Sequence, residues 1–368
     1  MISLSNSNSI AGLPASLLGG GTPPAGLDFV STWDTTKAGS ASNTVVLPLL
    51  SGGTYSGIIY WGDGNSDDLS YANRTHVYAS SGIYTITISG TIGGFQFNNV
   101  GDKAKITDIS NWGTLDITTD RSFYNCTNLD VSATDAPIIS TTNLSICFRG
   151  CTSLTTPDFS NWDVSGVQIF SSMFQQCSNF NGNVSTWDVS SGSNFSAMFV
   201  SCNVFNSDIT AWNLASATNV GGVAAATGMF ESCFVFNQDI SNWVFPNLTS
   251  LNRILFKARA FNQPIQNWNY SNITQMFAML YECNAFDQDL GSIDIDQVTQ
   301  MSSFMTNATG LSTANYDALL IGWAAQIPLS YTGTLNMGGS KYTAGGAAEA
   351  ARTALISEIG AITDGGPA

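Results

Sequence analysis

Apolar side chains recur about every 25 residues along the chain between residues 120 and 311. Six cysteines mark the period, with spacings of 25, 26, 25, 31 and 50 residues: Cys126, Cys151, Cys177, Cys202, Cys233 and Cys283. The last spacing is two periods long, with Ala258 at its centre. Large apolar residues stand three positions before and three positions after each of these sites. Because a residue that recurs at a fixed period has a structural cause, the pattern predicts about eight repeating units.

Tryptophans form a second series, ten or eleven residues after the cysteine positions: Trp162, Trp187, Trp212, Trp243 and Trp268. A unit of this length cannot bury its large side chains alone, so the units must stack on one another, which predicts a solenoid over residues 92–311. We interpret the cysteines and tryptophans as a structural ladder inside it, because free cysteine packs as a small hydrophobic residue. A disulfide or a zinc site is the alternative, although a ladder places one thiol at each level with no histidine beside it.

The two flanks of the repeat region have different patterns. Residues 27–91 alternate apolar and polar positions in runs such as "YSGIIYWGDG" and "GIYTITISG", which predicts a small β-sandwich. Residues 312–368 contain two amphipathic segments and predict a helical cap, with Thr343 and Gly360 at the ends of the second helix. Residues 1–26 are rich in Ser, Gly and Pro and predict an extended tail. The expected fold class is therefore mainly β with short helices.

Charged side chains are few and mostly acidic. They make up 10% of the chain, and the formal net charge is −15; typical soluble domains have about 25% charged residues. No Lys or Arg occurs between Gly150 and Asn252. Such a surface repels phosphate backbones and anionic lipids, so we expect no nucleic-acid partner. Neither a signal peptide nor a run of 18 apolar residues can be read in the sequence, so membrane insertion is not expected.

A short acidic segment is a weak candidate for a metal site. Asp63, Asn65 and Asp67 alternate as in the start of a calcium-binding loop, where oxygen ligands at every second residue can turn toward one cation. The Gly and Glu that complete an EF-hand loop are replaced by Asp68 and Arg74. A polar hairpin turn without a metal is the alternative.

One repeat is six residues longer than the usual 25, and its surplus falls within "VGGVAAATG", residues 220–228. Insertions in a solenoid protrude from one face, which is often the binding face. Gly221, Gly222 and Val223 are therefore weak candidates for contact with a partner, and a loop without function is the alternative.

Motifs for enzyme chemistry are missing. The sequence contains no G-x-S-x-G, no H-E-x-x-H, no phosphate-binding loop and no dinucleotide fingerprint, and His76 is its single histidine. The acids Asp208, Asp239 and Asp289 recur with the repeat, which indicates hydrogen bonds in turns, since a catalytic pair would be unique. We expect no enzymatic activity, no catalytic residue and no cofactor.

Two stretches resemble known families. The stretch "WGDGNSDD…THVYASSGIYTITISG" resembles the polycystic-kidney-disease (PKD) type of domain, in which the matching residues are mainly architectural: Trp61, Gly62, Asp63, Gly64, His76, Tyr78, Gly82 and Tyr84. Repeats such as "FNSDITAWNLASATNV" resemble the BspA-like surface proteins, a leucine-rich-repeat-like class. The second resemblance implies a right-handed solenoid with a C-terminal cap and a role in binding and display, and it supplies no catalytic residues.

The resemblance to BspA-like proteins is compatible with two functions. BspA-like proteins are mostly known or presumed bacterial adhesins and surface-display proteins, and similar arrays occur in phage virion proteins. We expect a structural or display protein of a bacteriophage virion, such as a capsid decoration, fibre or tail-associated protein, because no export signal is readable and unpaired cysteines fit assembly in a reducing cytoplasm. Residues 1–26 would anchor it to other virion proteins. The alternative is an adhesin of the bacterial cell surface that binds host glycans or proteins, and formation of a homo-oligomer is left open.

Overall fold

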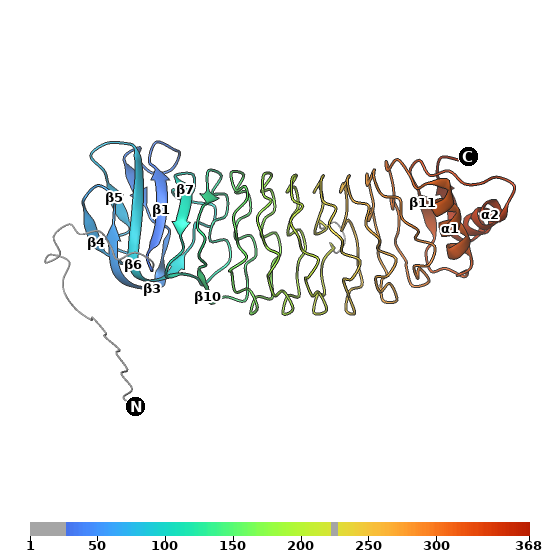
Figure 1. Cartoon of the computed structure of the whole chain (residues 1–368), viewed down its shortest axis with the longest axis horizontal. Coiled ribbons are helices and arrows are strands. Elements are labelled where there is room, and N and C mark those ends of the chain that lie inside the picture. Colours follow the sequence, from blue (N-terminus) through green and yellow to red (C-terminus); the bar gives the residue numbers. More distant parts are fainter. Residues whose placement is uncertain (1–26, 222–226) are drawn as a thin grey trace, which may run out of the picture.

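The computed structural model describes residues 27–221 and 227–368. Within these residues the protein is mainly β, with two α-helices near the C-terminus. Figure 1 shows an elongated molecule with β-strands at one end, a row of coils in the middle and the helices at the other end. The tail expected at residues 1–26 and the candidates Gly222 and Val223 lie outside the described residues. Neither described helix is long and apolar enough to cross a lipid bilayer.

The N-terminal end is a β domain built on antiparallel strands. Its strands are β1 (Phe29–Asp34), β2 (Thr44–Val46), β3 (Leu49–Tyr60), β4 (Ser66–Asp68), β5 (Thr75–Val77) and β6 (Ile83–Phe95). Strand β6 pairs with β1 and β3, and β3 also pairs with β4. Strands β2 and β5 form a separate two-stranded sheet. Burial alternates along β1, as expected for a strand with one face on the core.

The large sheet of the β domain continues into the first coils. Strand β7 (Ile106–Asn111) pairs antiparallel with β1 and parallel with β9 (Asp130–Val131). Strand β8 (Leu115–Ile117) pairs parallel with both β6 and β10 (Ile138–Ile139). The pairing therefore changes from antiparallel to parallel within one sheet, and the coils begin on a strand edge that is already hydrogen-bonded.

Coils of about 25 residues then stack in parallel, and we call this region the coil stack. Isolated parallel bridges join neighbouring coils, among them Asn143↔Ile169, Ile169↔Asn194, Asn194↔Asn219, Ser250↔Gln275 and Gln275↔Gln300. Backbone hydrogen bonds follow the same offset, for example from the N–H of Phe148 to the carbonyl oxygen of Met173, 2.9 Å. The repeat read from the sequence is thus a hydrogen-bonded register between neighbouring coils.

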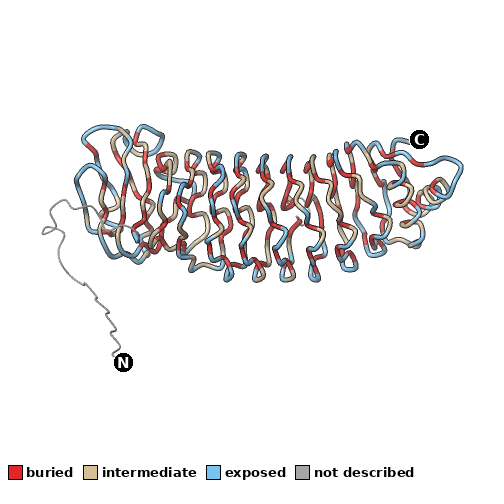
Figure 2. Tube along the Cα trace, in the orientation of Figure 1, coloured by how far each residue is buried: buried red, intermediate tan, exposed pale blue. Residues whose placement is uncertain are grey.

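Aromatic rings fill the interior of the coil stack. Figure 2 shows the buried positions along the inner side of each coil. One column contains Phe123, Phe148, Phe174, Phe199 and Phe230, whose successive ring centroids are 5.2, 5.7, 5.7 and 5.8 Å apart. These separations lie in the range of stabilising aromatic pairs. All five rings are fully buried, so each coil supplies one layer of a continuous core.

The last coil is closed by a small helical cap. It contains α1 (Thr313–Ala324), β11 (Gly333–Asn336), α2 (Ala347–Ile359) and β12 (Gly360–Thr363). Helix α1 buries Tyr316, Leu319, Leu320 and Trp323, the apolar face expected from their spacing. The expected start of α2 at Thr343 was wrong, because the helix is preceded by Gly346, which provides no side-chain cap. The N–H of Thr343 instead donates to the carboxylate of Asp317 at 2.9 Å.

Candidate binding face

One strip of each coil carries the side chains that distinguish the coils from one another. We define the outer strip as the residues from five before to one after each cysteine position, including Ala258 and Ala308. In the coil of Cys177 its outward residues are Ser172, Gln175, Gln176 and Ser178. In the coil of Ala258 the equivalent residues are Arg253, Phe256, Lys257 and Arg259. Small polar side chains are thus replaced by aromatic and basic ones in one part of the stack.

The replaced side chains form one cluster across three coils. The rings of Phe256 and Tyr281 stack with centroids 4.5 Å apart. The guanidinium carbon of Arg253 lies 3.7 Å from the centroid of the Phe256 ring, and that of Arg259 lies 4.8 Å from the Phe234 ring. Contacts between a cation and an aromatic face contribute about 0.5–1 kcal/mol at exposed sites. The cluster therefore holds its aromatic faces and cations in place at the surface.

Ion pairs fix the cations of the cluster without neutralising it. Arg253 makes two hydrogen bonds to Glu231, at 2.9 and 2.5 Å. Glu282 accepts a hydrogen bond from Arg259 at 2.9 Å and lies 3.7 Å from the ammonium of Lys257. Three cations face two carboxylates, which leaves one positive charge on this face of an acidic protein.

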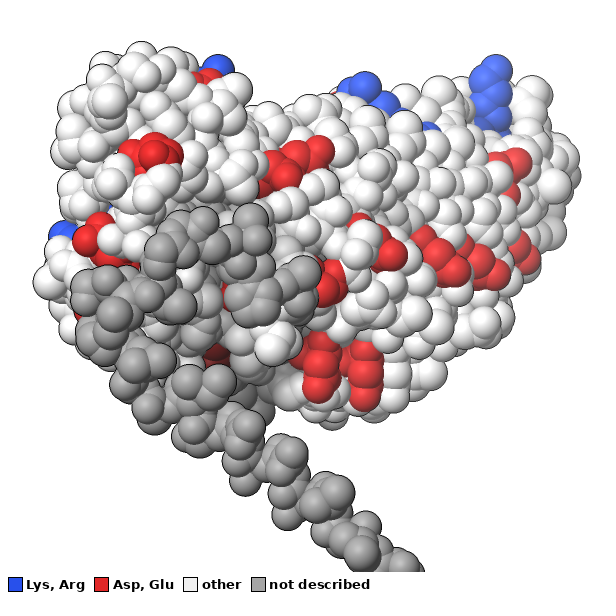
Figure 3. Space-filling view, turned by 60° about the vertical axis from the view of Figure 1, so that its left-hand side comes forward, with Lys and Arg blue, Asp and Glu red and all other residues white. Residues whose placement is uncertain are grey.

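The basic side chains of the coil stack lie on one side of it, where Glu231 and Glu282 are their acidic partners. Every Lys and Arg between residues 118 and 312 lies on the outer strip: Arg121, Arg149, Arg253, Lys257 and Arg259. In the view of Figure 3, acidic residues form rows along the coils, and several basic residues appear along the upper edge of the molecule. The outer strip is therefore where an anionic partner meets the least repulsion.

The acidic rows are part of the turns. Asp208, Asp239 and Asp289 each accept a hydrogen bond from the N–H two residues later, at 2.9, 3.0 and 2.7 Å. The N–H and hydroxyl of Thr210 lower the pKa of Asp208, and the hydroxyl and N–H of Ser241 lower that of Asp239. These carboxylates are thus hydrogen-bond acceptors in turns, in agreement with their recurrence along the sequence.

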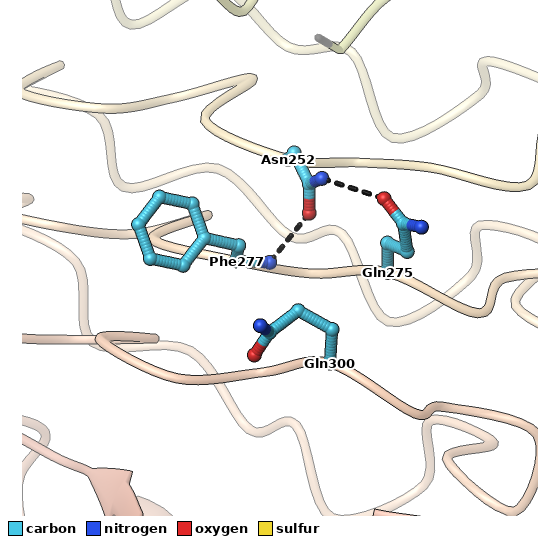
Figure 4. A pocket seen from close by; sticks show the side chains of 4 residues that line it. All are labelled: Asn252, Gln275, Phe277 and Gln300. Carbon is cyan, nitrogen blue, oxygen red and sulfur yellow. Dashed lines mark hydrogen bonds between the residues drawn. The ribbon is translucent and has the colours of Figure 1, made fainter. Parts of the chain in front are cut away.

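A pocket of about 320 Å³ opens beside the cluster and is lined by Asn252, Gln275, Phe277 and Gln300. These residues stand six or eight positions before the cysteine positions of three consecutive coils. In Figure 4 the amide of Asn252 lies between Gln275 and the backbone of Phe277. Its Nδ2 donates to Oε1 of Gln275 at 2.8 Å, and its Oδ1 accepts from the N–H of Phe277 at 2.6 Å.

Comparison with known families identifies the family to which the repeats belong. A family model described as "Mycoplasma protein of unknown function, DUF285" matches residues 117–227 and 216–317. The chain belongs to the DUF285 family. This family is related to the BspA-like leucine-rich-repeat surface proteins. No curated protein and no solved structure matches the chain.

The DUF285 matches cover the coil stack and leave out most of the β domain and the cap. They meet at residues 216–227, where the sequence shows its six-residue insertion. Gly221, at the start of this insertion, lies so close to the next coil that a Cβ atom would approach the carbonyl oxygen of Asn252 to 2.7 Å. Close backbone packing therefore accounts for this glycine.

The cysteines of the DUF285 repeats lie in the core. All seven cysteines of the chain are free and buried, including Cys147. Several thiols donate to a carbonyl oxygen one coil back, such as Cys177 to Phe148 at 2.9 Å and Cys202 to Phe174 at 3.0 Å. Burial raises the pKa of Cys147 and of Cys177 to about 12. The buried thiols are therefore protonated, and those of Cys177 and Cys202 join neighbouring coils as donors.

Four of the five tryptophans of the repeats make a similar link, and the indole N–H of Trp162 has no partner among the described residues. All five are almost fully buried: Trp162, Trp187, Trp212, Trp243 and Trp268. The indole N–H of Trp187 donates to the carbonyl oxygen of Phe159 at 2.8 Å, and that of Trp268 donates to Ile240 at 2.8 Å. Trp323 of α1 donates to Leu290 at 2.9 Å, so the cap continues this series beyond the family match.

The carboxylates among the calcium candidates in the β domain form hydrogen bonds with different partners. Asp63 accepts from the N–H of Asn65 at 3.0 Å and lies 2.8 Å from Nε2 of His76. Asp67 instead accepts the indole N–H of Trp61 at 2.8 Å. Burial would raise the pKa of Asp63, but the hydrogen bonds from His76 and Asn65 lower it. In the described parts of the chain, no three His, Cys, Asp or Glu residues are grouped to hold a metal ion.

Sequence reasoning missed the cluster on the outer strip. Arg253, Lys257 and Arg259 fall within seven residues, directly after a long stretch without any Lys or Arg. This sudden return of basic residues was the signal in the sequence that could have indicated the cluster. The aromatic partners Phe256 and Tyr281 are 25 residues apart, so only alignment of the repeats would have placed them side by side.

Proposed function

We propose that this protein is a non-enzymatic binding and display module, in which the coil stack presents the outer strip to a partner. The stack is a right-handed solenoid of the leucine-rich-repeat type, and the β domain is a PKD-like sandwich that supports its first coil. The relation of the family to BspA-like surface proteins supports this reading. The acidic side chains that recur along the stack are held in turns, which is a structural use of them.

The cluster around Phe256 carries the proposal. Aromatic and arginine side chains are enriched at interfaces, and Tyr and Arg are among the residue types that contribute most to binding energy. Here three consecutive coils carry them, whereas the strip of the coil of Cys177 carries only Ser and Gln at the outward positions, and that of Ala308 only Ser, Thr and Asn. Their orientation is fixed by stacking and ion pairs, so little side-chain entropy is lost when a partner binds.

Both expected locations stay predictions; the relation of the family to BspA-like surface proteins is the argument for the bacterial surface. A bacteriophage virion remains the other prediction. It depends on an anchoring role of residues 1–26, which lie outside the described residues. Size-exclusion chromatography with light scattering on the full chain and on a chain lacking these residues tests that role. A larger assembly formed by the full chain alone supports the virion prediction.

A binding screen tests the proposed function. The full chain is labelled and applied to a glycan array and to host-cell surface proteins, beside a variant carrying Phe256→Gln and Arg259→Ser. These substitutions install the residues that the coil of Cys177 has at the same positions, Gln175 and Ser178. Since hot-spot residues contribute about 2 kcal/mol or more, we expect binding to weaken about thirtyfold.

The matched control for this screen changes the coil of Cys177 itself, through Gln175→Ala and Ser178→Ala. Circular-dichroism melting curves verify that both variants fold. Binding that survives in the cluster variant, or that is lost equally in the control, would contradict a binding role of this cluster.

A further inference from the structure

The hydrogen bonds of the pocket fix the orientation of its amide groups. The N–H of Phe277 is a donor, so the atom of Asn252 that faces it at 2.6 Å must be the oxygen. The Nδ2 group of Asn252 therefore donates to Gln275, whose Oε1 accepts at 2.8 Å. This chain of contacts leaves the Nε2 group of Gln275 directed away from Asn252, as Figure 4 shows.

Gln300 is fixed in the same way from the next coil. Its Oε1 accepts hydrogen bonds from the N–H and the hydroxyl of Ser302, at 2.9 and 2.8 Å. Its Nε2 group, like that of Gln275, makes no hydrogen bond to the described part of the chain. The two glutamines are paired by a parallel bridge, so their backbones are about 4.8 Å apart. Two Nε2 groups on neighbouring coils are thus available in a pocket whose lining also includes Phe277.

We propose that this pocket binds a single sugar residue that carries a carboxylate, such as a sialic or uronic acid. This inference rests on the proposed binding function. Donor groups without acceptors select a ligand rich in oxygen acceptors, and the Phe277 ring offers an apolar wall for the C–H face of a sugar ring. A volume of about 320 Å³ is at the small end of ligand pockets, which suits one ring.

The charge of the neighbouring cluster favours the acidic sugar over a neutral one. Arg253 directly follows Asn252 in the chain, and Lys257 and Arg259 lie on the same coil. The net positive charge of this cluster attracts a carboxylate to a protein whose formal charge of −15 otherwise repels it. Binding should therefore weaken as salt is added, because the cluster is at the surface.

Titration of the full chain with free sugars tests the inference. N-acetylneuraminic acid and glucuronic acid are the probes, N-acetylglucosamine and glucose are the neutral controls, and saturation-transfer NMR or calorimetry measures the affinity. In Gln275→Glu and Gln300→Glu, one oxygen still accepts the native hydrogen bond and the donor group becomes an anionic oxygen. We expect each variant to bind the sugar acid at least about tenfold more weakly.

Asn194→Asp is the matched control. Asn194 stands at the position of Gln275 three coils earlier, and its Oδ1 accepts from the N–H of Ser196 at 3.0 Å, outside the pocket. It should bind the sugar acids like the parent protein. Equal binding of neutral sugars, unchanged affinity in both glutamine variants, or no binding of either acid would overturn the inference.

These outcomes are distinguishable from failure of the proposed function. If the Phe256→Gln and Arg259→Ser variant loses binding to a glycan or protein partner while Gln300→Glu retains it, the binding module stands and the pocket has no role. If the parent chain binds no partner in the screen and no sugar acid in the titration, both proposals are wrong.

Discussion

At the scale of single residues, cysteine has a use in the coils that alanine lacks. The carbonyl oxygen of Phe148 accepts the N–H of Cys151 within its own coil, at 3.0 Å, and the thiol of Cys177 from the next coil, at 2.9 Å. Alanine at position 258 fills the space without this second bond. A buried thiol that donates weakly to a backbone carbonyl is a packing device, and its burial suppresses the thiolate that redox or metal chemistry would need.

The thiols should consequently be unreactive in the folded protein. At pH 8 we expect essentially none of the seven cysteines to react with Ellman's reagent, and all seven to react in guanidinium chloride. Because burial raises the pKa of Cys177 to about 12, its contribution to stability is complete below its ordinary pKa and is lost as pH rises toward 12. Rapid reaction of several thiols at pH 8 without denaturant would contradict the buried ladder.

Backbone conformation is the second feature at this scale. Most coils hold two residues in the left-handed region, four positions apart, such as Ser172 with φ of 56° and Gln176 with φ of 66°. This conformation costs about 1–2 kcal/mol for a residue with a side chain. No propensity signal reveals these positions in the sequence, since Ser, Gln, Ala, Ile and Lys all occupy them. Stacking against neighbouring coils imposes the conformation.

Replacement by glycine at one of these positions should stabilise the protein. For Ser172→Gly we expect a gain of about 0.5–1 kcal/mol in the free energy of unfolding, since relief of the strained φ outweighs the added entropy of the unfolded chain. The neighbouring Ser171→Gly, outside the left-handed region, should lose about 0.5–1 kcal/mol. Thermal and urea unfolding of both variants provide the measurement, and an equal loss in the two would show that the strain is absent.

At the scale of elements, the ends of the coil stack were harder to predict than its middle. The period of the apolar residues was enough to predict the coils, because every coil buries large apolar side chains at equivalent positions. The β domain and cap have no repeat, so their boundaries depend on individual contacts. Strand β6 crosses the expected boundary at residue 91, and the N–H of Thr343 bonds to Asp317 ahead of α2.

The cap is held by one ion pair inside it. Asp364 follows β12, and its side chain is only 3% exposed. It accepts hydrogen bonds from Arg352 of α2 at 2.7 Å and from the hydroxyl of Tyr316 of α1 at 2.7 Å. Burial would raise the pKa of Asp364, but these bonds and the N–H of Gly366 lower it below its ordinary value. Three elements of the cap therefore meet at one carboxylate.

Loss of this carboxylate should loosen the cap. Because it removes the charged acceptor of Arg352 and of the Tyr316 hydroxyl, Asp364→Asn is expected to cost about 1.5–3 kcal/mol. Since the folded pKa is lowered, the stability from Asp364 is present above about pH 4 and is lost as pH falls through the folded pKa. Urea unfolding between pH 3 and 7 should show this acid loss in the parent and less of it in Asp364→Asn. The exposed Asp296→Asn is the control, and a pH dependence identical in all three chains would contradict the role of Asp364.

At the scale of the whole molecule, one sheet connects the β domain to the coil stack. The junction also contains a buried ion pair, in which the ammonium of Lys105 lies 3.7 Å from Asp102 and both side chains are inaccessible to solvent. Lys105 donates to the carbonyl oxygens of Ala41 and Thr44, at 2.9 and 2.7 Å. Asp102 accepts the N–H of Val46 at 2.7 Å, so the loop before β2 is fastened to the strand that leads into the first coil.

Loss of this buried ion pair should destabilise the neighbouring coils as well, and the effect should decrease with distance from the junction. Removal of one partner of a buried pair costs about 3–5 kcal/mol. In a stack where each coil contacts only its neighbours, a local loss is passed on through successive interfaces. For Lys105→Met we therefore expect faster amide hydrogen exchange in β1, β2 and β6, a smaller increase in the coil of Cys126, and no change in the coil of Cys283.

Lys103→Met is the matched control, because Lys103 is partly exposed and, among residues 27–221 and 227–368, its ammonium donates only to Asn99, at 2.5 Å. Its exchange pattern, measured by mass spectrometry on the full chain, should match that of the parent. If Lys105→Met accelerated exchange equally from the β domain to the cap, the molecule would unfold as one cooperative unit, and the repeats would not behave as a chain of separate interfaces. If exchange rose only within the β domain, the continuous sheet would not couple it to the coils. A graded response would agree with the structure, in which the β domain and the first coils share one sheet and single bridges join the later coils.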